Sequence, residues 1–376
     1  MILENLIVAE KMIKWIFLCL LAGFMTSLSY AQKFVHQEGI HSFFNNNEFS
    51  GCSVKTSQTM AGVHFVPQLG LSYQEKHRIF VGMDALHEFG SERAVDLCDP
   101  VAYYQFDSQP FVFYMGAFPR KPLLSNYPRM FFRDSIRFYC PMINGIFWEY
   151  RSKKDDYMNV WLDWTSRQSE ERRENFFMGW SGKIHFGIFY AQHFGYMFHF
   201  AGRMNPPTPE PVQDNGLMLT STGIDLAKKA NFEKLELNAG FSAGLEQDRG
   251  TTDGWRRSRG FLSELKVEYR GIGLFNTLYS GRGQQIFYNR FANDLYWGDQ
   301  VYRASKYDRA DFYVYFIKNQ AASVKFVYSL HFLENKMFHE QSLYATFDLN
   351  NLSKNKTEKY KRFWSNWFKQ DNDTDE

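Results

Sequence analysis

Residues 231–247, NFEKLELNAGFSAGLEQ, alternate strictly between apolar and polar side chains. Every odd position from Leu235 to Leu245 is apolar, whereas the even positions are charged, polar or glycine. A period of two residues places the two rows on opposite faces of a β-strand. In a soluble sheet the apolar row faces a protein core, and in a membrane barrel the same row faces lipid. One strand leaves both alternatives open.

The same alternation recurs along the chain, at 61–73, 157–165, 259–270, 324–332 and 341–349. These runs are longer than the ~5–6 residues typical of soluble strands. They fit the ~9–11 residues of a tilted membrane strand better. Aromatic residues make up 18% of the chain and collect at the ends of many runs, which is typical of interfacial girdles. The pattern therefore favours a transmembrane β-barrel, with a soluble β-sandwich as the alternative.

The connections between the runs alternate between long and short. Long ones lie near 91–99, 119–140, 202–214 and 281–306, and short ones near 74–76, 152–156, 182–183 and 318–320. Long outer loops and short periplasmic turns are typical of outer-membrane barrels. Closing an antiparallel barrel then needs one more strand near IHSFF (40–44). We predict an all-β, antiparallel transmembrane β-barrel of about 16 strands (14 if weak segments are dropped), with N- and C-termini periplasmic.

The two ends of the chain have their own character. Residues 1–31 contain a basic start, an apolar run and small residues before Ala31, which predicts a signal peptide that is removed. A membrane-anchoring helix is the alternative. The barrel is expected over 32–350. Residues 351–376 form a periplasmic C-terminal tail, either a disordered extension or a short amphipathic helix on the membrane.

The chain resembles the Gram-negative outer-membrane porins, most closely the uncharacterised porin-like proteins of Bacteroidetes. The resemblance rests on the signal followed by Gln32, on the alternation over 57–349, and on the stretches YMGAFPRKPLL (114–124), WLDWTSRQ (161–168) and LYWGDQVYRASKYDRADFYVYF (295–316). It implies an outer-membrane channel for passive diffusion of small hydrophilic solutes. A non-channel barrel acting as an enzyme or surface binding protein is the second hypothesis.

The same resemblance sets the expected partners. They are outer-membrane lipid and lipopolysaccharide, the barrel assembly machinery, small hydrophilic solutes and a possible homo-oligomer. We expect no enzymatic activity, no cofactor and no metal. The net charge is only +2, which argues against nucleic acid.

The third long connection is rich in basic residues. In sixteen-stranded porins the third outer loop folds into the barrel, so the resemblance implies a pore constriction that binds anionic solutes. The alternative is a surface loop whose arginines bind lipopolysaccharide phosphates or pair with acids. The basic residues are Arg120, Lys121, Arg129, Arg133 and Arg137.

Charged residues also lie on the polar rows of the predicted strands. They are expected to form the lumen wall, either as ion pairs that hold the strand register or as a ladder that steers solute. The residues are Lys234, Glu236, Glu246, Glu264, Lys266, Glu268, Arg309 and Asp311.

The sequence contains no motif of a known catalytic site. GxSxG, HExxH, CxxC and P-loop patterns are absent. His185, His193 and His199 lie close in sequence, but no Ser or Asp stands at a recognisable spacing from them, so we predict no catalytic residue. Cys52 and Cys98 fall in the first two predicted outer loops, which favours a disulfide between them.

Overall fold

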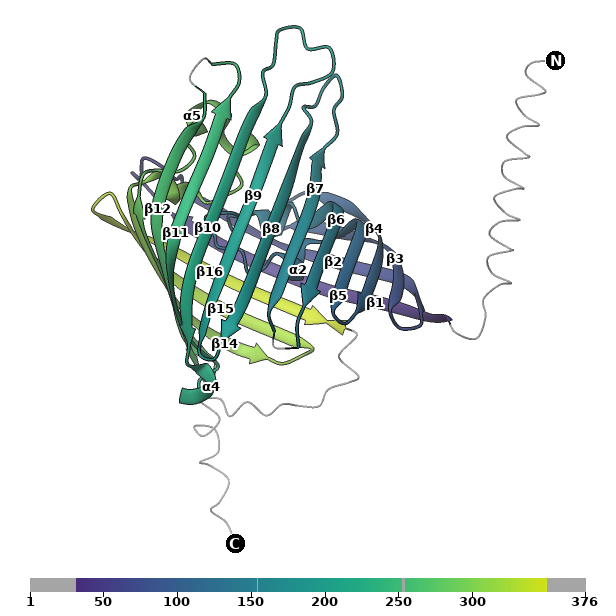
Figure 1. The fold of residues 1–376 in the computed structure, drawn as a ribbon. Coiled ribbons are helices and arrows are strands. Elements are labelled where there is room, and N and C mark those ends of the chain that lie inside the picture. The colour runs from purple at the N-terminus through teal and green to yellow at the C-terminus, as the bar shows by residue number, and fades with distance from the viewer. Residues whose placement is uncertain (1–31, 154, 252–253, 350–376) are drawn as a thin grey trace, which may run out of the picture.

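A computed structural model describes residues 32–153, 155–251 and 254–349, and in these residues sixteen strands close into one antiparallel barrel (Figure 1). Each strand pairs with its neighbours in the chain, and β1 closes the wall against β16. The predicted fold class and strand number are confirmed. The predicted signal peptide (1–31) and the whole of the predicted tail (351–376) lie outside the described residues.

The strands of the barrel wall average more than ten residues in length. The first eight are β1 (Gln32–Glu48), β2 (Gln58–Tyr73), β3 (His77–Glu88), β4 (Leu97–Ser108), β5 (Phe111–Pro119), β6 (Met142–Arg151), β7 (Tyr157–Ser166) and β8 (Asn175–Phe186). The second eight are β9 (Phe189–Phe200), β10 (Gln213–Asp225), β11 (Lys234–Asp248), β12 (Arg256–Tyr269), β13 (Ile272–Gly281), β14 (Lys306–Lys318), β15 (Ala322–Leu333) and β16 (Lys336–Asp348).

The helical segments are short and lie in connections. None of the described helices is long and apolar enough to cross a membrane. Figure 1 shows α4 at the end of the barrel with the short turns and α5 at the opposite end. The segments are α2 (Arg120–Leu123) and α3 (Ile136–Tyr139) between β5 and β6, α4 (Ala227–Ala230) between β10 and β11, and α5 (Tyr288–Leu295) with the 3-10 helix η1 (Gln300–Arg303) between β13 and β14.

Strand β11 shows which face of the alternating segment 231–247 points out of the barrel and which points inward. Leu237 and Phe241 are 50% and 73% exposed on the outside of the wall, whereas Asn238, Ser242 and Glu246 are buried inside. Because outward apolar rows are what lipid requires, the alternation marks a membrane wall and not the face of a soluble core.

The additional strand predicted near IHSFF is present, because β1 contains this segment and pairs with β2 from Gln32 opposite Tyr73 onward. One predicted turn was wrong. The turn predicted at 182–183 lies at 187–188, since Gly187 takes a positive φ of 68° that glycine adopts without strain. Residues 182–183 instead continue the β8 ladder.

The inside of the barrel holds a packed aromatic core. The connections 120–141 and 282–305 fold inward and meet inward-facing aromatic residues of β5–β9. Phe131 of the first connection is fully buried, and the Trp297 ring of the second lies 4.8 Å from that of Phe177. The interior of this sector is therefore packed, because the two loops supply apolar partners to the wall.

Candidate functional site

The basic connection 120–141 enters the barrel, and Arg120 is its anchor. The side chain is buried, with Nη2 at 2.6 Å from Asp163 Oδ2 of β7. It also donates hydrogen bonds to the carbonyl oxygens of Cys140 (3.0 Å) and Met142 (2.7 Å). These contacts to Asp163, Cys140 and Met142 link the loop to the wall, whereas Arg120 Nη1 is buried without a hydrogen-bond partner among the described residues.

Two further arginines of this loop are also engaged. Arg129 lies 2.9 Å from Asp134 and 3.1 Å from Asp311, and Arg133 donates to the carbonyl oxygen of Tyr296 at 2.8 Å. Burial raises the pKa of Asp134, but Arg129 and neighbouring arginines outweigh it and lower that pKa to about 2. Carboxylates thus neutralise Arg120 and Arg129, whereas Arg133 meets only neutral oxygens among the described residues. Lys121 and Arg137 remain and line a cavity inside the barrel.

The predicted lumen-wall residues lie on inward rows and are mostly held by partners. Glu246 accepts hydrogen bonds from the backbone N–H groups of Gln285 (3.1 Å) and Ile286 (2.9 Å), which fixes the 282–305 connection. The other contacts are Arg309 with Asp311 and Glu340, Glu268 with Lys234 and Lys318, and Glu264 with Lys266, whereas Glu236 faces inward near the short-turn end. These contacts stabilise register and loop position.

The predicted disulfide is not formed, since Cys52, Cys98 and Cys140 are all free. Cys98 lies within β4 and is exposed, whereas Cys52 packs against the inner aromatic core. The two thiols therefore belong to different environments.

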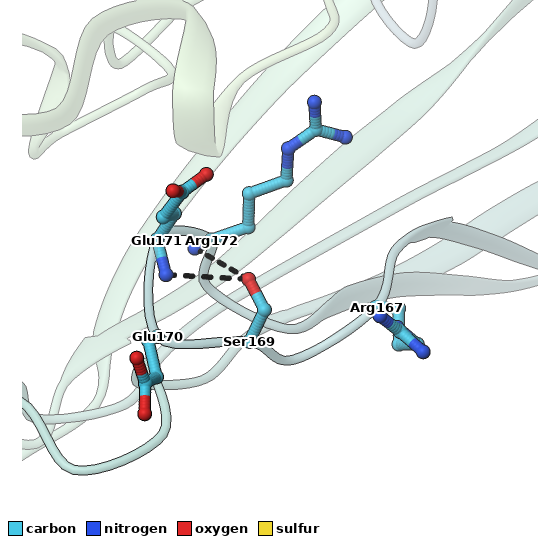
Figure 2. Close-up of a pocket in the computed structure, with 5 residues that line it drawn as sticks. All are labelled: Arg167, Ser169, Glu170, Glu171 and Arg172. Atoms are coloured by element: carbon cyan, nitrogen blue, oxygen red, sulfur yellow. Dashed lines mark hydrogen bonds between the residues drawn. The ribbon is translucent and has the colours of Figure 1, made fainter.

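A polar pocket lies on the connection between β7 and β8 (Figure 2). The Ser169 hydroxyl accepts hydrogen bonds from the backbone N–H groups of Glu171 (3.3 Å) and Arg172 (3.0 Å). Figure 2 shows the charged ends of the surrounding side chains pointing away from one another. This pocket therefore has the geometry of a loop turn, and its side chains do not converge on a reacting group.

Histidine–carboxylate pairs offer better catalytic geometry, and the barrel has several. Two face inward, His64 with Asp84 at 2.6 Å and His331 with Glu340 at 3.2 Å, and His185 with Asp156 (2.9 Å) lies near a short turn. The pair His199–Asp214 faces outward.

The His199–Asp214 pair lies where β9 and β10 meet the long connections. The two residues are directly opposite in register, and His199 Nδ1 lies 2.8 Å from Asp214 Oδ1. A carboxylate only accepts hydrogen bonds, so Nδ1 donates and Nε2 is the free basic nitrogen. Arg249 donates from Nε to Asp214 Oδ2 at 2.9 Å and holds the carboxylate in place.

The outward surface beside this pair is aromatic. The Phe176 ring lies 5.1 Å from the His199 ring, and Trp164 lies 5.0 Å from Phe176. The side chains of Arg257 and Arg259 are exposed on the outward row of β12. They stand two strands from Asp214, roughly 10 Å across the wall. The surface thus combines a basic imidazole, an apolar platform and cations.

The strand that carries His199 is packed from the inside. Phe198 and Phe200 flank His199 in sequence and face inward, where both are buried. The Phe198 ring stacks on Phe177 at 4.2 Å and meets Trp297 of the 282–305 connection at 6.4 Å.

An imidazole oriented by a carboxylate is a general base. Within the described residues, no Ser, Thr or Cys side chain hydrogen-bonds to His199, so water is the nucleophile it can activate. The same residues bring together no group of three His, Cys, Asp or Glu side chains that could hold a metal ion. A search for catalytic spacings in the sequence does not find this pair, because a long loop separates its two residues. Only the register of β9 and β10 brings them together.

A closed barrel with apolar residues facing outward defines this chain as an outer-membrane β-barrel protein. More narrowly, it belongs to the family described as Lipid A 3'-O-deacylase-type, whose model matches residues 30–361. No curated protein matches the chain.

The chain is similar to several solved structures, of which the first below has a TM-score above 0.5 and agrees on the fold. An anion-selective porin from Comamonas acidovorans is 8% identical with a TM-score of 0.52, over 84% of this chain and 99% of that one. A loop-deletion mutant of OmpT from Vibrio cholerae is 8% identical over 85% and 99%, with a TM-score of 0.49. OmpF from Salmonella typhi is 10% identical over 85% and 98%, with a TM-score of 0.48.

The family corrects two expectations. A deacylase-type family is a family of enzymes, so the prediction of no enzymatic activity was wrong. The porin resemblance was correct for the outer-membrane barrel and for its location in the outer membrane, but the porin family itself was too specific.

Proposed function

We propose that this protein is an outer-membrane hydrolase that removes an ester-linked acyl chain from lipid A, with His199 as general base and Asp214 as its orienting partner. The observation that carries the proposal is the outward-facing pair His199–Asp214, in a chain of the Lipid A 3'-O-deacylase-type family. The substrate class comes from the family, and the residues come from the geometry.

The position of the pair suits this substrate. Lipid A lies in the outer leaflet, so a deacylating group has to point away from the barrel near its outer end. We place the long connections outside, as in other outer-membrane barrels. His199 then lies at the level where sugar and ester groups meet the acyl region, and Trp164 and Phe176 offer a surface for the alkyl chain.

The chemistry is ester hydrolysis. His199 Nε2 takes a proton from water, and the water oxygen attacks the ester carbonyl carbon. The carbon–oxygen bond to the sugar then breaks, and the sugar oxygen receives the proton from the imidazolium. Products are a long-chain carboxylic acid and a free sugar hydroxyl. General-base catalysis contributes roughly 10²–10⁴-fold to such a rate.

Exposed arginines support binding of the phosphorylated head group. Arg257 and Arg259 lie on the lipid-facing row of β12, and Arg guanidinium groups bind phosphate through two parallel hydrogen bonds. These contacts set which acyl chain reaches His199.

A channel for small hydrophilic solutes has less support. The likeness to an anion-selective porin concerns the fold alone. The loops 120–141 and 282–305 fill much of the lumen with buried aromatic side chains, and Arg120 and Arg129 are held by carboxylates. Planar-bilayer conductance of the pure protein tests this second function, and a stable ion current would favour it.

The hydrolase is tested with purified full-length protein and lipid A in mixed micelles. Mass spectrometry should detect lipid A that has lost one acyl chain and the released acid. His199→Gln should abolish the loss. His339→Gln is the matched control, because His339 also faces outward at the long-connection end but hydrogen-bonds to Tyr328 at 2.7 Å instead of a carboxylate. Equal activity of wild type and His199→Gln would reject the assignment.

A further inference from the structure

The interior contains a cavity separate from the His199 surface. Its volume is about 1150 Å³, slightly above the ~300–1,000 Å³ of pockets that hold drug-sized ligands. Residues of the short-turn end, Ser72, Glu75 and Ser323, line one side, and the in-folded connection 120–141 lines the other. The cavity thus reaches the end of the barrel opposite the long connections.

Four cations on the cavity wall lack a carboxylate within 4.0 Å in the part of the chain that the structure describes. Three of them are Lys121, Arg137 and Lys325, and the fourth, Arg78, donates to the backbone carbonyl oxygen of Glu75 at 3.2 Å. Lys325 instead stands over the Tyr313 ring at 3.9 Å. Burial, and then the neighbouring Arg137, lower the pKa of Lys121. Within the cavity the Lys121 and Arg137 side chains are exposed and that of Lys325 is half-buried. Like charges that line one cavity repel one another, and a bound anion relieves that repulsion.

Glu38, Glu75 and Asp348 line the cavity towards the short-turn end, and the acids deeper in the wall are already engaged. Asp134 and Asp311 pair with Arg129, and Asp84 holds His64 Nδ1. His64 is only 5% exposed, and its Nε2 has no hydrogen-bond partner among the described residues. The wall therefore has a surplus of cations and one open polar position.

The rest of the wall is apolar. It includes several buried aromatic and aliphatic side chains: Phe43, Phe80, Leu124, Phe132 and Phe138. A hydrated inorganic anion gains nothing from such a surface, whereas an alkyl chain gains about 0.8 kcal/mol for each CH₂ that leaves water. Cations and apolar walls together select a ligand that has both parts.

We propose that this cavity binds a long-chain carboxylate from the short-turn end, with Lys121, Arg137 and Lys325 around the head group and the aromatic wall around the chain. The site is distinct from the His199 surface and does not depend on the hydrolysis proposed there. The hydrolase would release a ligand of this class on the other side of the wall.

The test is equilibrium dialysis of radiolabelled dodecanoate against full-length protein in amphipol. Dodecanoate should bind with one site per chain. Dodecanol, which lacks the charge, and acetate, which lacks the chain, should each compete at least tenfold more weakly. Equal competition by dodecanol or by acetate would overturn the proposal.

Variants locate the site. Lys121→Met and Lys325→Met should each weaken binding roughly tenfold, as expected for one lost charge-assisted contact. Lys183→Met is the matched control, because Lys183 also stands over a tyrosine ring, that of Tyr190 at 3.9 Å, but does not line the cavity. Lys325→Arg should retain binding. An unchanged affinity in both methionine variants, with heat-modifiability on gels proving that they are folded, would refute the site.

A further control separates the two proposals. His199→Gln should bind dodecanoate like the wild type, and Lys325→Met should deacylate lipid A like the wild type. Loss of dodecanoate binding in His199→Gln would contradict the independence of the cavity.

Discussion

Replacing Asp214 with asparagine should remove the base while leaving the shape of the site unchanged. Asp214 accepts from His199 Nδ1 (2.8 Å) with one oxygen and from Arg249 (2.9 Å) with the other. An asparagine has only one oxygen, and the Arg249 guanidinium, which only donates, takes it. The amide NH₂ then faces His199 Nδ1, which must accept, so the ring proton moves to Nε2 and the basic position is lost.

The expected size follows from the role of a general base. Losing it lowers kcat by roughly 10²–10⁴-fold. That range corresponds to about 3–5 kcal/mol in the activation barrier. KM should change little, because Asp214 is mostly covered by its partners and is not a binding group for the acyl chain. The measurement is the initial rate of acyl release from lipid A in mixed micelles.

A double variant tests whether the tautomer of His199 causes the loss of activity. With Arg249→Met added to Asp214→Asn, the amide is free to turn its oxygen to His199 Nδ1 and restore the original tautomer. The double variant should therefore recover kcat relative to Asp214→Asn alone, even where the loss of Arg249 raises KM. If Asp214→Asn keeps the wild-type kcat, or if the double variant is no faster than the single one, the tautomer argument fails.

Three other predictions concern the scaffold. Arg120→Met should destabilise the barrel by about 3–5 kcal/mol in urea unfolding because it leaves Asp163 buried without its partner, and adding Asp163→Leu should recover part of this loss. The low pKa of Asp134 contributes about 2 kcal/mol of stability that is present above pH 3.8 and is lost as the pH falls towards 2, so Asp134→Asn should lack this pH dependence. Phe241→Lys, at the centre of the outward row of β11, should cost about 2–4 kcal/mol, whereas Phe241→Leu should be nearly neutral.

Most strands of the wall could be predicted because the two-residue alternation that defines a strand is present in the sequence of each segment by itself. A period of two residues identifies each strand and its two faces, and the alternation of loop lengths gives the strand number. The error at 182–183 arose because two glycines competed for one turn, and only Gly187 takes a positive φ. Which of them reverses the chain depends on pairing with β7 and β9, which local sequence does not encode.

The interior and the candidate site could not be predicted in the same way. Arg120 meets Asp163 across 43 positions of sequence, so one of the basic residues predicted to bind solute instead forms an ion pair that anchors the loop. His199 and Asp214 come from different strands, and no fixed sequence spacing identifies them as a pair. Both cases depend on how strands and loops meet in space.

The aromatic packing behind His199 has a consequence for the outer surface. Phe198 and Phe200 pack against the inner core, so the strand that carries the imidazole is held from inside the barrel. A smaller side chain at Phe198 should let this strand shift and slow the proposed reaction on the opposite face of the wall. The lumen core would thus provide the rigidity that the proposed site on the lipid-facing surface needs.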